Sequence, residues 1–509
     1  MKDVVRILSV AFSVCQALFC YGQTASDTVD VNEKTFMLSG PGAVFGKGIY
    51  EASPAASLYR YGVSYTEIGA SYRMRDENEA LLMQLGDRFD AGAFTADSWL
   101  RLDSASAAFA SVEYVNGRTA GVLWNSSSDF LLLYPYVTAD TVGGSLSYEK
   151  YFFSGGYSRR DGVVSYGVYG SYRALHEYRR IDPRPRNITS DFKAAVSAGC
   201  SFGEYILEAA FSVRLYRQIS DVDFYDPSGA NTSEIPMTGL GTYYERFSGT
   251  GAYLGTYHKG NGYCVSIGLV PENRRGWLAG AEYDVLTIGR LLSNQNDVPI
   301  TSLSLSSLSL YAAYRGDSLG VYVQGRLGQR LGYENVIDNG SSNMFNVLGS
   351  FGMYLSKSFS VIAGGYREWK RGSALWSVSP EAGWRSFLSE YLYPRRVMDC
   401  GGVSFRFPVS FTVVKGPWLI RAGLSPEAYV STGGTLDISP LGAEAAMTEM
   451  VGAVFSTLSS SAYGGRASLR LQRSLNRTMA VFIRADYGFF RYSSGNVRNR
   501  ADIKIGICF

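Results

Sequence analysis

The strongest constraint on this chain is a period-two alternation of apolar residues with small or polar ones, which recurs along most of its length. Every second residue from Phe192 to Phe202 is apolar or a cysteine, and another alternating run extends from Leu207 to Leu215. A helix would place its apolar residues three and four positions apart, so these runs predict β-strands paired as hairpins. Composition agrees, because 57 Gly, 37 Tyr and 27 Phe accompany only 15 Pro, and aromatic-rich chains favour extended structure.

The length of the runs separates this chain from a soluble β-sandwich. Many runs cover roughly 11 residues or more, which a tilted strand needs to cross a bilayer, whereas strands in soluble sheets average about five or six. The face opposite the apolar residues mixes Gly, Ser and Ala with charged and aromatic residues, as the lumen of a membrane barrel does.

The spacing of turn signals supports the same fold. Tight turns are predicted near Asn116–Gly117, Asp161–Gly162, Gly203–Glu204 and Asn261–Gly262, and also at 414–416 and 474–477. Longer connections alternate with them, over 126–144, 175–189, 218–242, 432–462 and 492–500. Short periplasmic turns that alternate with long outer loops are typical of outer-membrane barrels. We therefore predict an all-β fold: a closed antiparallel transmembrane β-barrel of the bacterial outer membrane, with an even strand number near 16–18. Between about 271 and 400 the alternation of short and long connections is lost, so the number of strands there stays open.

The N-terminal residues divide into two predicted parts. Residues 1–22 combine basic Lys2 and Arg6 with a short apolar stretch and a small residue, Gly22, which is the pattern of a signal peptide. Residues 23–56 lack alternation and are predicted to be a periplasmic segment or the entry to the first strand. The barrel is predicted to cover 57–509.

The C-terminal strand carries a second signal. Ile503, Ile505, Ile507 and Phe509 fall on one face. Since an open sheet edge cannot exist in lipid, the last strand must pair with the first, and this face is predicted to contact lipid. Phe509 resembles the terminal aromatic by which the barrel-assembly machinery recognises its substrates, so it is a candidate assembly signal.

Little in the sequence suggests catalysis. The two histidines, His176 and His258, are predicted at the start of an outer loop and beside a periplasmic turn, and therefore at opposite membrane faces. No catalytic, cofactor-binding or metal-binding residue is predicted, and the chain is not expected to be an enzyme. The net charge of +3 favours no nucleic-acid partner.

The cysteines that follow the predicted signal peptide are scattered. Cys200, Cys264, Cys400 and Cys508 indicate neither a zinc site nor a disulfide framework, although one or two bridges stay open.

One arginine cluster is a candidate binding site. Arg179, Arg180, Arg184 and Arg186 could contact an anionic ligand or lipopolysaccharide phosphates. The alternative is a solvated loop whose arginines pair with nearby carboxylates. The aromatic stretch at 129–137 is interpreted as an interfacial girdle, with a sugar-stacking platform as the alternative.

Three stretches carry a resemblance to a known family. "WNSSSDFLLLYPYVTADTVGG", "YRALHEYRRIDPRPRN" and "GLGTYYERF" resemble an uncharacterised outer-membrane β-barrel family of Bacteroidota, whose members commonly occur alongside TonB-dependent nutrient uptake systems. The resemblance implies a transport channel or an accessory to such a system, with lipopolysaccharide, a TonB-dependent receptor or a surface lipoprotein as candidate partners. No N-terminal plug domain is recognised, so the chain is not expected to be a TonB-dependent receptor itself. The alternatives are a structural or assembly barrel with a closed lumen and, less favoured, a lipid-modifying hydrolase.

Overall fold

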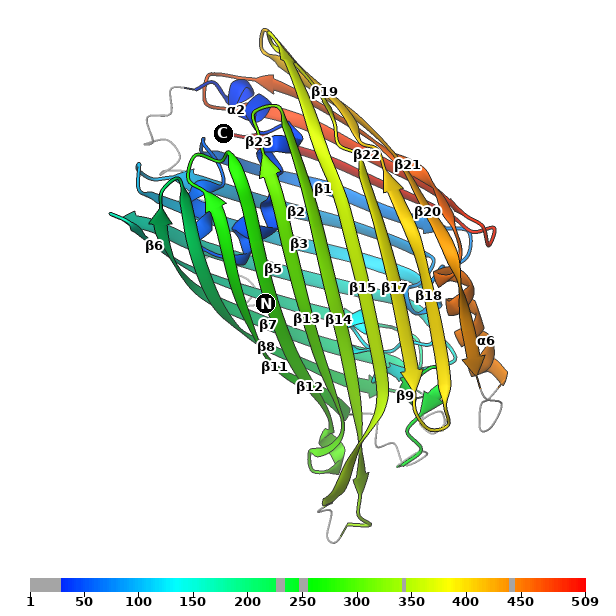
Figure 1. The fold of residues 1–509 in the computed structure, drawn as a ribbon. Helices are drawn as coiled ribbons and strands as arrows, with labels where there is room; N and C mark the ends of the chain where they lie inside the picture. The colour runs from blue at the N-terminus through cyan, green and yellow to red at the C-terminus, as the bar shows by residue number, and fades with distance from the viewer. Residues whose placement is uncertain (1–28, 226–233, 247–254, 341–344, 439–444) are drawn as a thin grey trace.

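The computed structural model describes residues 29–225, 234–246, 255–340, 345–438 and 445–509. The predicted signal peptide at 1–22 lies outside the described residues. Within these ranges the chain forms an antiparallel sheet that closes on itself, because the last strand pairs with the first (Figure 1). The closed barrel has 18 strands, which confirms the predicted all-β barrel and its even strand number.

Twenty strand segments, all within the described ranges, build this ring. In order around the barrel they are β1 (Tyr65–Glu77), β2 (Arg88–Arg101), β3 (Ser106–Val122), β5 (Gly144–Asp161), β6 (Val164–Tyr178), β7 (Arg184–Phe202), β8 (Tyr205–Asp223), β11 (Gly255–Pro271), β12 (Gly276–Leu292), β13 (Val298–Arg315), β14 (Leu319–Ile337), β15 (Val347–Arg371), β16 with β17 (Ala374–Val378 and Glu381–Tyr391), β18 with β19 (Arg396–Arg406 and Val409–Lys415), β20 (Trp418–Ile438), β21 (Ala462–Ser474), β22 (Ala480–Tyr492) and β23 (Val497–Cys508). The two double segments are single strands interrupted at Pro380 and Pro408, where the missing N–H breaks the ladder.

The two faces of the barrel follow the predicted alternation. Apolar side chains on the outer face are strongly exposed: the exposed fraction is 57% for Val196, 60% for Leu207 and 58% for Ile505. In the last strand Ile503 and Ile505 point outward, whereas Cys508 is buried on the inner face. None of the described helices combines the length and apolarity needed to cross a bilayer.

The two ends of the barrel differ in their connections. At one end, which we call the short-turn end, the hairpin turns contain two to five residues, and the C-terminus lies there with Phe509 hydrogen-bonded to Thr66. The opposite, long-loop end carries the long connections at 123–143, 224–254 and 439–461. The turns predicted at Asp161–Gly162 and Gly203–Glu204 are confirmed at the short-turn end.

Two predicted turns are wrong. Asn116–Gly117 lies in the middle of β3, and Asn261–Gly262 lies in the middle of β11. Instead, these glycines allow the neighbouring strand to approach closely. A Cβ on Gly117 would lie 2.6 Å from the Cβ of Ala91, and one on Gly262 would lie 2.6 Å from the carbonyl oxygen of Val285.

Two predicted long connections are shorter than expected, and a third begins later. β6 continues to Tyr178 and β7 resumes at Arg184, so the connection predicted at 175–189 is only a brief turn. Likewise, β22 ends at Tyr492 and β23 begins at Val497, so the connection predicted at 492–500 is a brief turn. The connection predicted at 218–242 begins only after Asp223 and lasts until β11 begins at Gly255. At these strand ends backbone pairing persists where the apolar alternation has faded into polar sequence, so the sequence pattern understates the strands.

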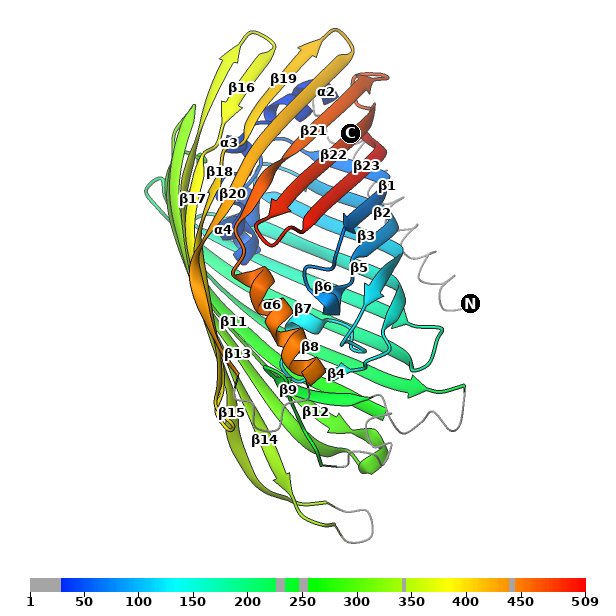
Figure 2. The ribbon, with the colours of Figure 1, turned by 90° about the vertical axis from the view of Figure 1, so that its right-hand side faces the viewer.

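The N-terminal segment lies inside the barrel at the short-turn end (Figure 2). It consists of α2 (Val31–Met37), α3 (Pro41–Val44), α4 (Lys47–Ala52) and the 3₁₀ helix η1 (Ala55–Tyr59). Its buried side chains pack on inward-facing residues of the wall, where Trp99, Leu278 and Tyr366 belong to the same core cluster. The described part of the predicted segment 23–56 therefore contacts the barrel lumen. The periplasmic position of this segment stays a prediction.

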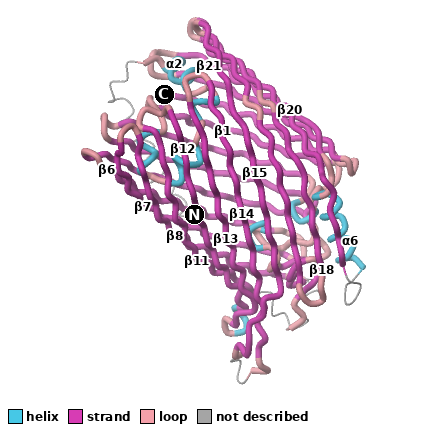
Figure 3. The backbone as a smooth tube through the Cα atoms, viewed as in Figure 1, coloured by secondary structure: helices cyan, strands magenta, loops and turns pink. Residues whose placement is uncertain are grey.

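The long-loop end is also filled by the chain (Figure 3). The elements there are η2 (Met83–Leu85), α5 (Phe130–Leu133), β4 (Thr138–Ala139), β9 (Ile235–Gly239), β10 (Thr242–Tyr243), η5 (Ser293–Gln295) and α6 (Ala445–Leu458). Leu133, Met237 and Val451 from three of these connections pack on wall residues such as Tyr354. The girdle interpretation of 129–137 is wrong, because Leu133, Tyr136 and Val137 are buried within this filling.

Candidate functional site

A chamber of about 910 Å³ lies in the lumen beside the N-terminal segment. It is bounded by the turn between α2 and α3 and by the inner faces of β1, β2 and β16–β23. Its lining contains three carboxylates, Glu381, Asp486 and Asp502, against a larger number of arginines: Arg73, Arg75, Arg406, Arg421, Arg466, Arg484 and Arg500. The chamber is therefore strongly basic.

Sheet register explains how two of these arginines, Arg421 and Arg484, come to lie near each other. Arg421, Arg470, Arg484 and Lys504 are direct cross-strand partners on β20, β21, β22 and β23, so they form one continuous row on the inner face. Like charges placed directly opposite each other in a sheet are destabilising. A row of four cations therefore needs compensating anions nearby.

Most of the chamber arginines have such an anion. Arg484 pairs with Asp486 at 2.7 Å, and Arg73 pairs with Asp502 at 3.3 Å. Similar pairs join Arg466 to Glu427 at 3.3 Å, Arg406 to Glu381 at 3.3 Å and Arg75 to Glu77 at 3.6 Å. These pairs hold the wall of the chamber in a fixed arrangement.

Arg421 and Arg500 differ from their neighbours. Within the described ranges, neither guanidinium makes a salt bridge or hydrogen bond. Both line the chamber, and each lies near other cations: Arg484 and Arg470 around Arg421, and Arg498, Arg75 and Arg466 around Arg500. The chamber thus keeps two cationic groups without a bonded anion.

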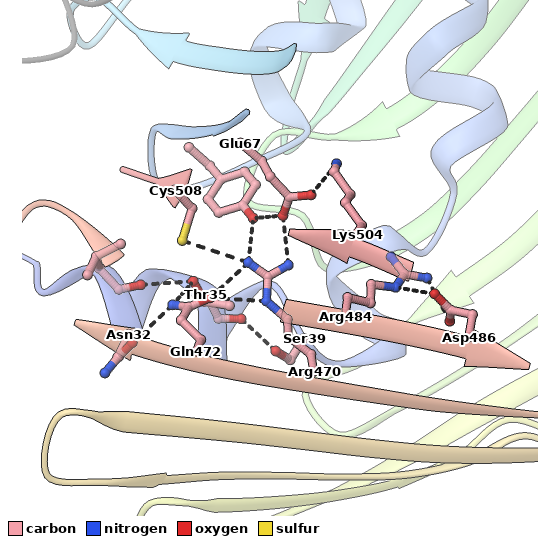
Figure 4. A network of polar contacts seen from close by, with 12 residues as sticks. Asn32, Thr35, Ser39, Glu67, Arg470, Gln472, Arg484, Asp486, Lys504 and Cys508 are labelled. Carbon is pink, nitrogen blue, oxygen red and sulfur yellow. Dashed lines mark hydrogen bonds and ion pairs between the residues drawn. The ribbon is translucent and has the colours of Figure 1, made fainter. Parts of the chain in front are cut away.

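A polar network fastens α2 to the wall above this chamber (Figure 4). Asp30 caps the helix by accepting a hydrogen bond from the N–H of Asn32 at 2.8 Å. The side-chain amide of Gln472 on β21 donates to Asn32 Oδ1 and to Thr35 Oγ1, both at 3.0 Å. Asn32 in turn donates to the carbonyl of Pro417 at 2.9 Å.

The network continues into the row of cations. Arg470 donates to Glu67 at 2.7 Å, and Lys504 donates to the other oxygen of Glu67 at 2.6 Å. Arg470 also donates to Gln472 Oε1 at 3.0 Å, so it orients the amide that holds α2. The docking of α2 is therefore coupled to the charges of β1, β21 and β23.

Further contacts hold the rest of the N-terminal segment. Gly42 donates its N–H to Glu368 at 2.7 Å, Trp99 donates to the carbonyl of Ser57 at 3.1 Å, and Ala55 donates to Ser197 at 2.7 Å. A Cβ at Gly167 would lie 2.5 Å from the backbone nitrogen of Ala55, so this glycine permits the close approach. All these attachments are noncovalent.

A buried ion pair and a buried hydrogen bond hold the filling of the long-loop end in place. Arg179 and Asp140 pair at 3.0 Å with both side chains fully buried, and Arg396 donates to the carbonyl of Leu240 at 2.8 Å. Burial raises the pKa of Glu234, in the connection between β8 and β9, to about 8, and neighbouring Asp140 adds to that effect. This end is a packed polar and apolar core.

The predicted arginine cluster does not form one exposed patch. Arg179 is buried in the pair just described, whereas Arg184 donates to Asp182 at 2.7 Å, as the solvated-loop alternative anticipated. Arg180 stacks near the ring of Tyr178, and Arg186 is exposed. Ligand or lipopolysaccharide contact by Arg180, Arg184 and Arg186 stays a prediction.

The predicted placement of the histidines is partly wrong. Because Asn261–Gly262 is not a turn, His258 lies at the long-loop end, the same end as His176. They nevertheless project from opposite faces of the sheet. His258 is buried inside, 3.3 Å from the carbonyl of Tyr136, while His176 stacks on Tyr178 and pairs across strands with the exposed Ile188.

The described residues contain no group of three or more potential metal ligands. Cys200, Cys264, Cys400 and Cys508 are all free, and three of them are buried. No disulfide joins these four cysteines in the structure.

Sequence reasoning missed the chamber arginines. A usable signal existed, because Arg484 of the chamber and neighbouring Arg470 occupy the polar positions of two consecutive alternating runs. What the alternation could not supply was the register that places them side by side with Arg421 and Lys504.

These features define a class: a closed 18-stranded barrel whose lumen is filled from both ends by its own chain and retains a basic chamber. The chain belongs to a family of unknown function, DUF6850, whose model matches residues 54–509. Among curated proteins, no match was found.

Solved structures share the general barrel form. BauA, the ferric preacinetobactin receptor from Acinetobacter baumannii, is 10% identical with a TM-score of 0.41, covering 87% of this chain and 80% of its own. The siderophore receptor PiuA from the same organism is 8% identical with a TM-score of 0.37, covering 88% and 82%. The CymD monoaromatic hydrocarbon channel is 12% identical with a TM-score of 0.32, covering 94% and 97%. Likeness at this level says nothing about ligands or partners.

Proposed function

We propose that this protein is an outer-membrane transport barrel whose short-turn end is closed at rest by its own N-terminal segment and opens to solute when that segment leaves the lumen. The observation that carries the proposal is the noncovalent docking of α2, α3, α4 and η1 inside the short-turn end. A closed barrel with an apolar outer face and no free sheet edge suits a bilayer. The short-turn end, which also holds the C-terminus, would then face the periplasm.

The docking of the segment combines two kinds of contact. Each hydrogen bond that holds α2 contributes about 1 kcal/mol net, and buried side chains such as Phe36, Tyr50 and Leu58 add apolar contact with the wall. A ligand or partner that releases the segment has to replace both. We propose that the protein works as an accessory to a TonB-linked uptake system, with a receptor or surface lipoprotein contacting its outer loops.

A reversible crosslink tests the gate. Thr35 on α2 is a near neighbour of the Cys508 thiol on β23. A Thr35→Cys variant should form a disulfide with Cys508 that fastens the segment to the wall. In a planar bilayer, the oxidised variant is expected to stay silent, while reduction should restore whatever openings the unmodified protein shows.

The matched control is Thr35→Cys combined with Cys508→Ser, which cannot form this bridge and should ignore the redox state. A second variant, Gln472→Ala, removes two hydrogen bonds to α2 and should raise the frequency of openings. Equal silence of every variant, with the barrel still folded by heat-modifiability on gels, would contradict the gate. It would favour the alternative, a structural barrel with a closed lumen, which the dense ion pairing of the wall also suits.

A further inference from the structure

The two unpaired arginines of the chamber indicate which solutes it accepts. We propose that the chamber binds a small solute carrying two or more carboxylate or phosphate groups, with Arg421 and Arg500 as its binding residues. This names the solute class for the proposed transport function and rests on that function only for the claim that the bound solute is moved. Binding itself can be measured on the resting barrel.

The electrostatic argument starts from the wall. Arg421 is a direct cross-strand neighbour of Arg470, which is itself paired with Arg484 across strands. Glu67 compensates Arg470, and Asp486 compensates Arg484. Arg421 is left without a carboxylate of its own. An anion in the chamber would supply the missing charge.

Arg500 is in the same position as Arg421: it lacks a carboxylate partner while its cationic neighbours have one. It lies on β23, four residues before Lys504. Arg500 is the cross-strand partner of Arg75 and of Gly488, and Gly488 lies opposite Arg466 on the next strand. Arg75 and Arg466 have carboxylate partners in Glu77 and Glu427. Gly488 has no side chain, and the aliphatic part of Arg466 packs over it, 3.5 Å from where a Cβ would lie. Arg500 is left without a carboxylate of its own.

Distance favours a solute with more than one anionic group. Arg421 and Arg500 lie three strands apart and four residues apart along the strand direction, which corresponds to roughly 20 Å between their Cα atoms. Their long side chains extend toward a shared space bordered by small residues, Gly423 and Ser468. A planar guanidinium binds carboxylate and phosphate in the same bidentate manner. Both anion types are therefore included, and the experiment separates them.

A second basic cavity lies behind the N-terminal segment. It has a volume of about 440 Å³, and its lining includes Arg60, Arg274 and Arg315. Residues 37–44 border both cavities, so the segment separates the basic chamber from this second basic space. Displacement of the segment would join two cationic compartments, which suits the passage of an anion.

Binding is tested on the full-length barrel in detergent by isothermal titration calorimetry. The probes are citrate, pyrophosphate and inorganic phosphate, with maltose as a neutral solute. We expect citrate or pyrophosphate to bind more tightly than inorganic phosphate, and maltose not to bind. Arg421→Gln and Arg500→Gln should each weaken that binding about tenfold or more, because each removes a charge-assisted bidentate contact. The preference between citrate and pyrophosphate identifies the anion type.

Arg326→Gln is the matched control, since Arg326 lies on β14 away from the chamber and contacts Ser307 at 3.3 Å. It should leave binding unchanged. The proposal is overturned if no anion binds a folded barrel, or if all three variants lose affinity equally, which would indicate general attraction to positive charge. Both results leave the gate proposal standing, because the redox-dependent conductance does not depend on solute affinity.

Discussion

At the scale of single residues, arginines in this barrel act in two distinct ways. Some are paired and hold segments in place: Arg179 holds the filling of the long-loop end through Asp140, and Arg470 orients the amide that fastens α2. Others, Arg421 and Arg500, face the chamber without a bonded anion. Since removing one partner of a buried pair leaves the other charge uncompensated, the two kinds should respond differently to substitution.

The first prediction compares Arg179 with Arg186. Arg179→Ala should lower the free energy of unfolding by about 3–5 kcal/mol, because it leaves the buried carboxylate of Asp140 without its charge partner. Arg186→Ala, at an exposed position, should change it by less than about 0.5 kcal/mol. Urea unfolding of the barrel in lipid vesicles, followed by tryptophan fluorescence, measures both. Similar losses in the two variants would contradict the structural role assigned to Arg179.

At the scale of elements, strand length and chain closure are governed by the requirement that every backbone polar group in lipid be paired. The described strands of the ring run past the apolar part of their sequence, and the last strand closes on β1 from Glu67 to Glu77. Glycines within the strands, such as Gly117 and Gly262, make room for neighbours and do not mark turns.

The lipid face of β23 gives the second prediction. Ile505→Lys should lower the free energy of unfolding by about 2–4 kcal/mol if the residue lies near the bilayer midplane, because a charge would enter hydrocarbon. Ile505→Phe keeps an apolar side chain and should have little effect. Insertion and unfolding in vesicles of defined composition check both. A tolerated lysine would show that Ile505 does not face lipid.

Phe509 belongs to the same element. Its backbone pairs with Thr66, so the terminal residue takes part in closing the barrel. That contact is compatible with its predicted role as an assembly signal, and the role itself stays a prediction.

At the scale of the whole molecule, the chain fills its own lumen from opposite ends and leaves a basic space between the filling and one wall. Helices and a 3₁₀ turn enter from the short-turn end, and inward-folded connections enter from the other. The two fillings differ physically. The long-loop filling contains a fully buried ion pair, Arg179 with Asp140. The segment α2 is held by neutral hydrogen bonds and by the burial of Val31 and Phe36 against the wall.

This difference leads to a prediction of selectivity. A barrel opened by Gln472→Ala should prefer anions, because arginines outnumber carboxylates along the chamber. The reversal potential across a potassium chloride gradient measures that preference, and adding Arg421→Gln should reduce it. Cation preference of the opened barrel would contradict a conducting path through the chamber.

The sequence by itself determined the barrel. Period-two alternation of long runs and the lipid face of Ile503 and Ile505 are local patterns, and a closed sheet is the arrangement that satisfies them in lipid. The positions of turns were predicted less well, since an Asn–Gly pair marks a hairpin turn in one context and a close contact between strands in another. Only the tertiary structure decided that residues 29–60 enter the lumen, that His258 lies at the long-loop end, and that Arg421, Arg470, Arg484 and Lys504 form one row. Each of these depends on register between strands or on contacts between segments far apart in the chain, and a local alternation carries no information about either.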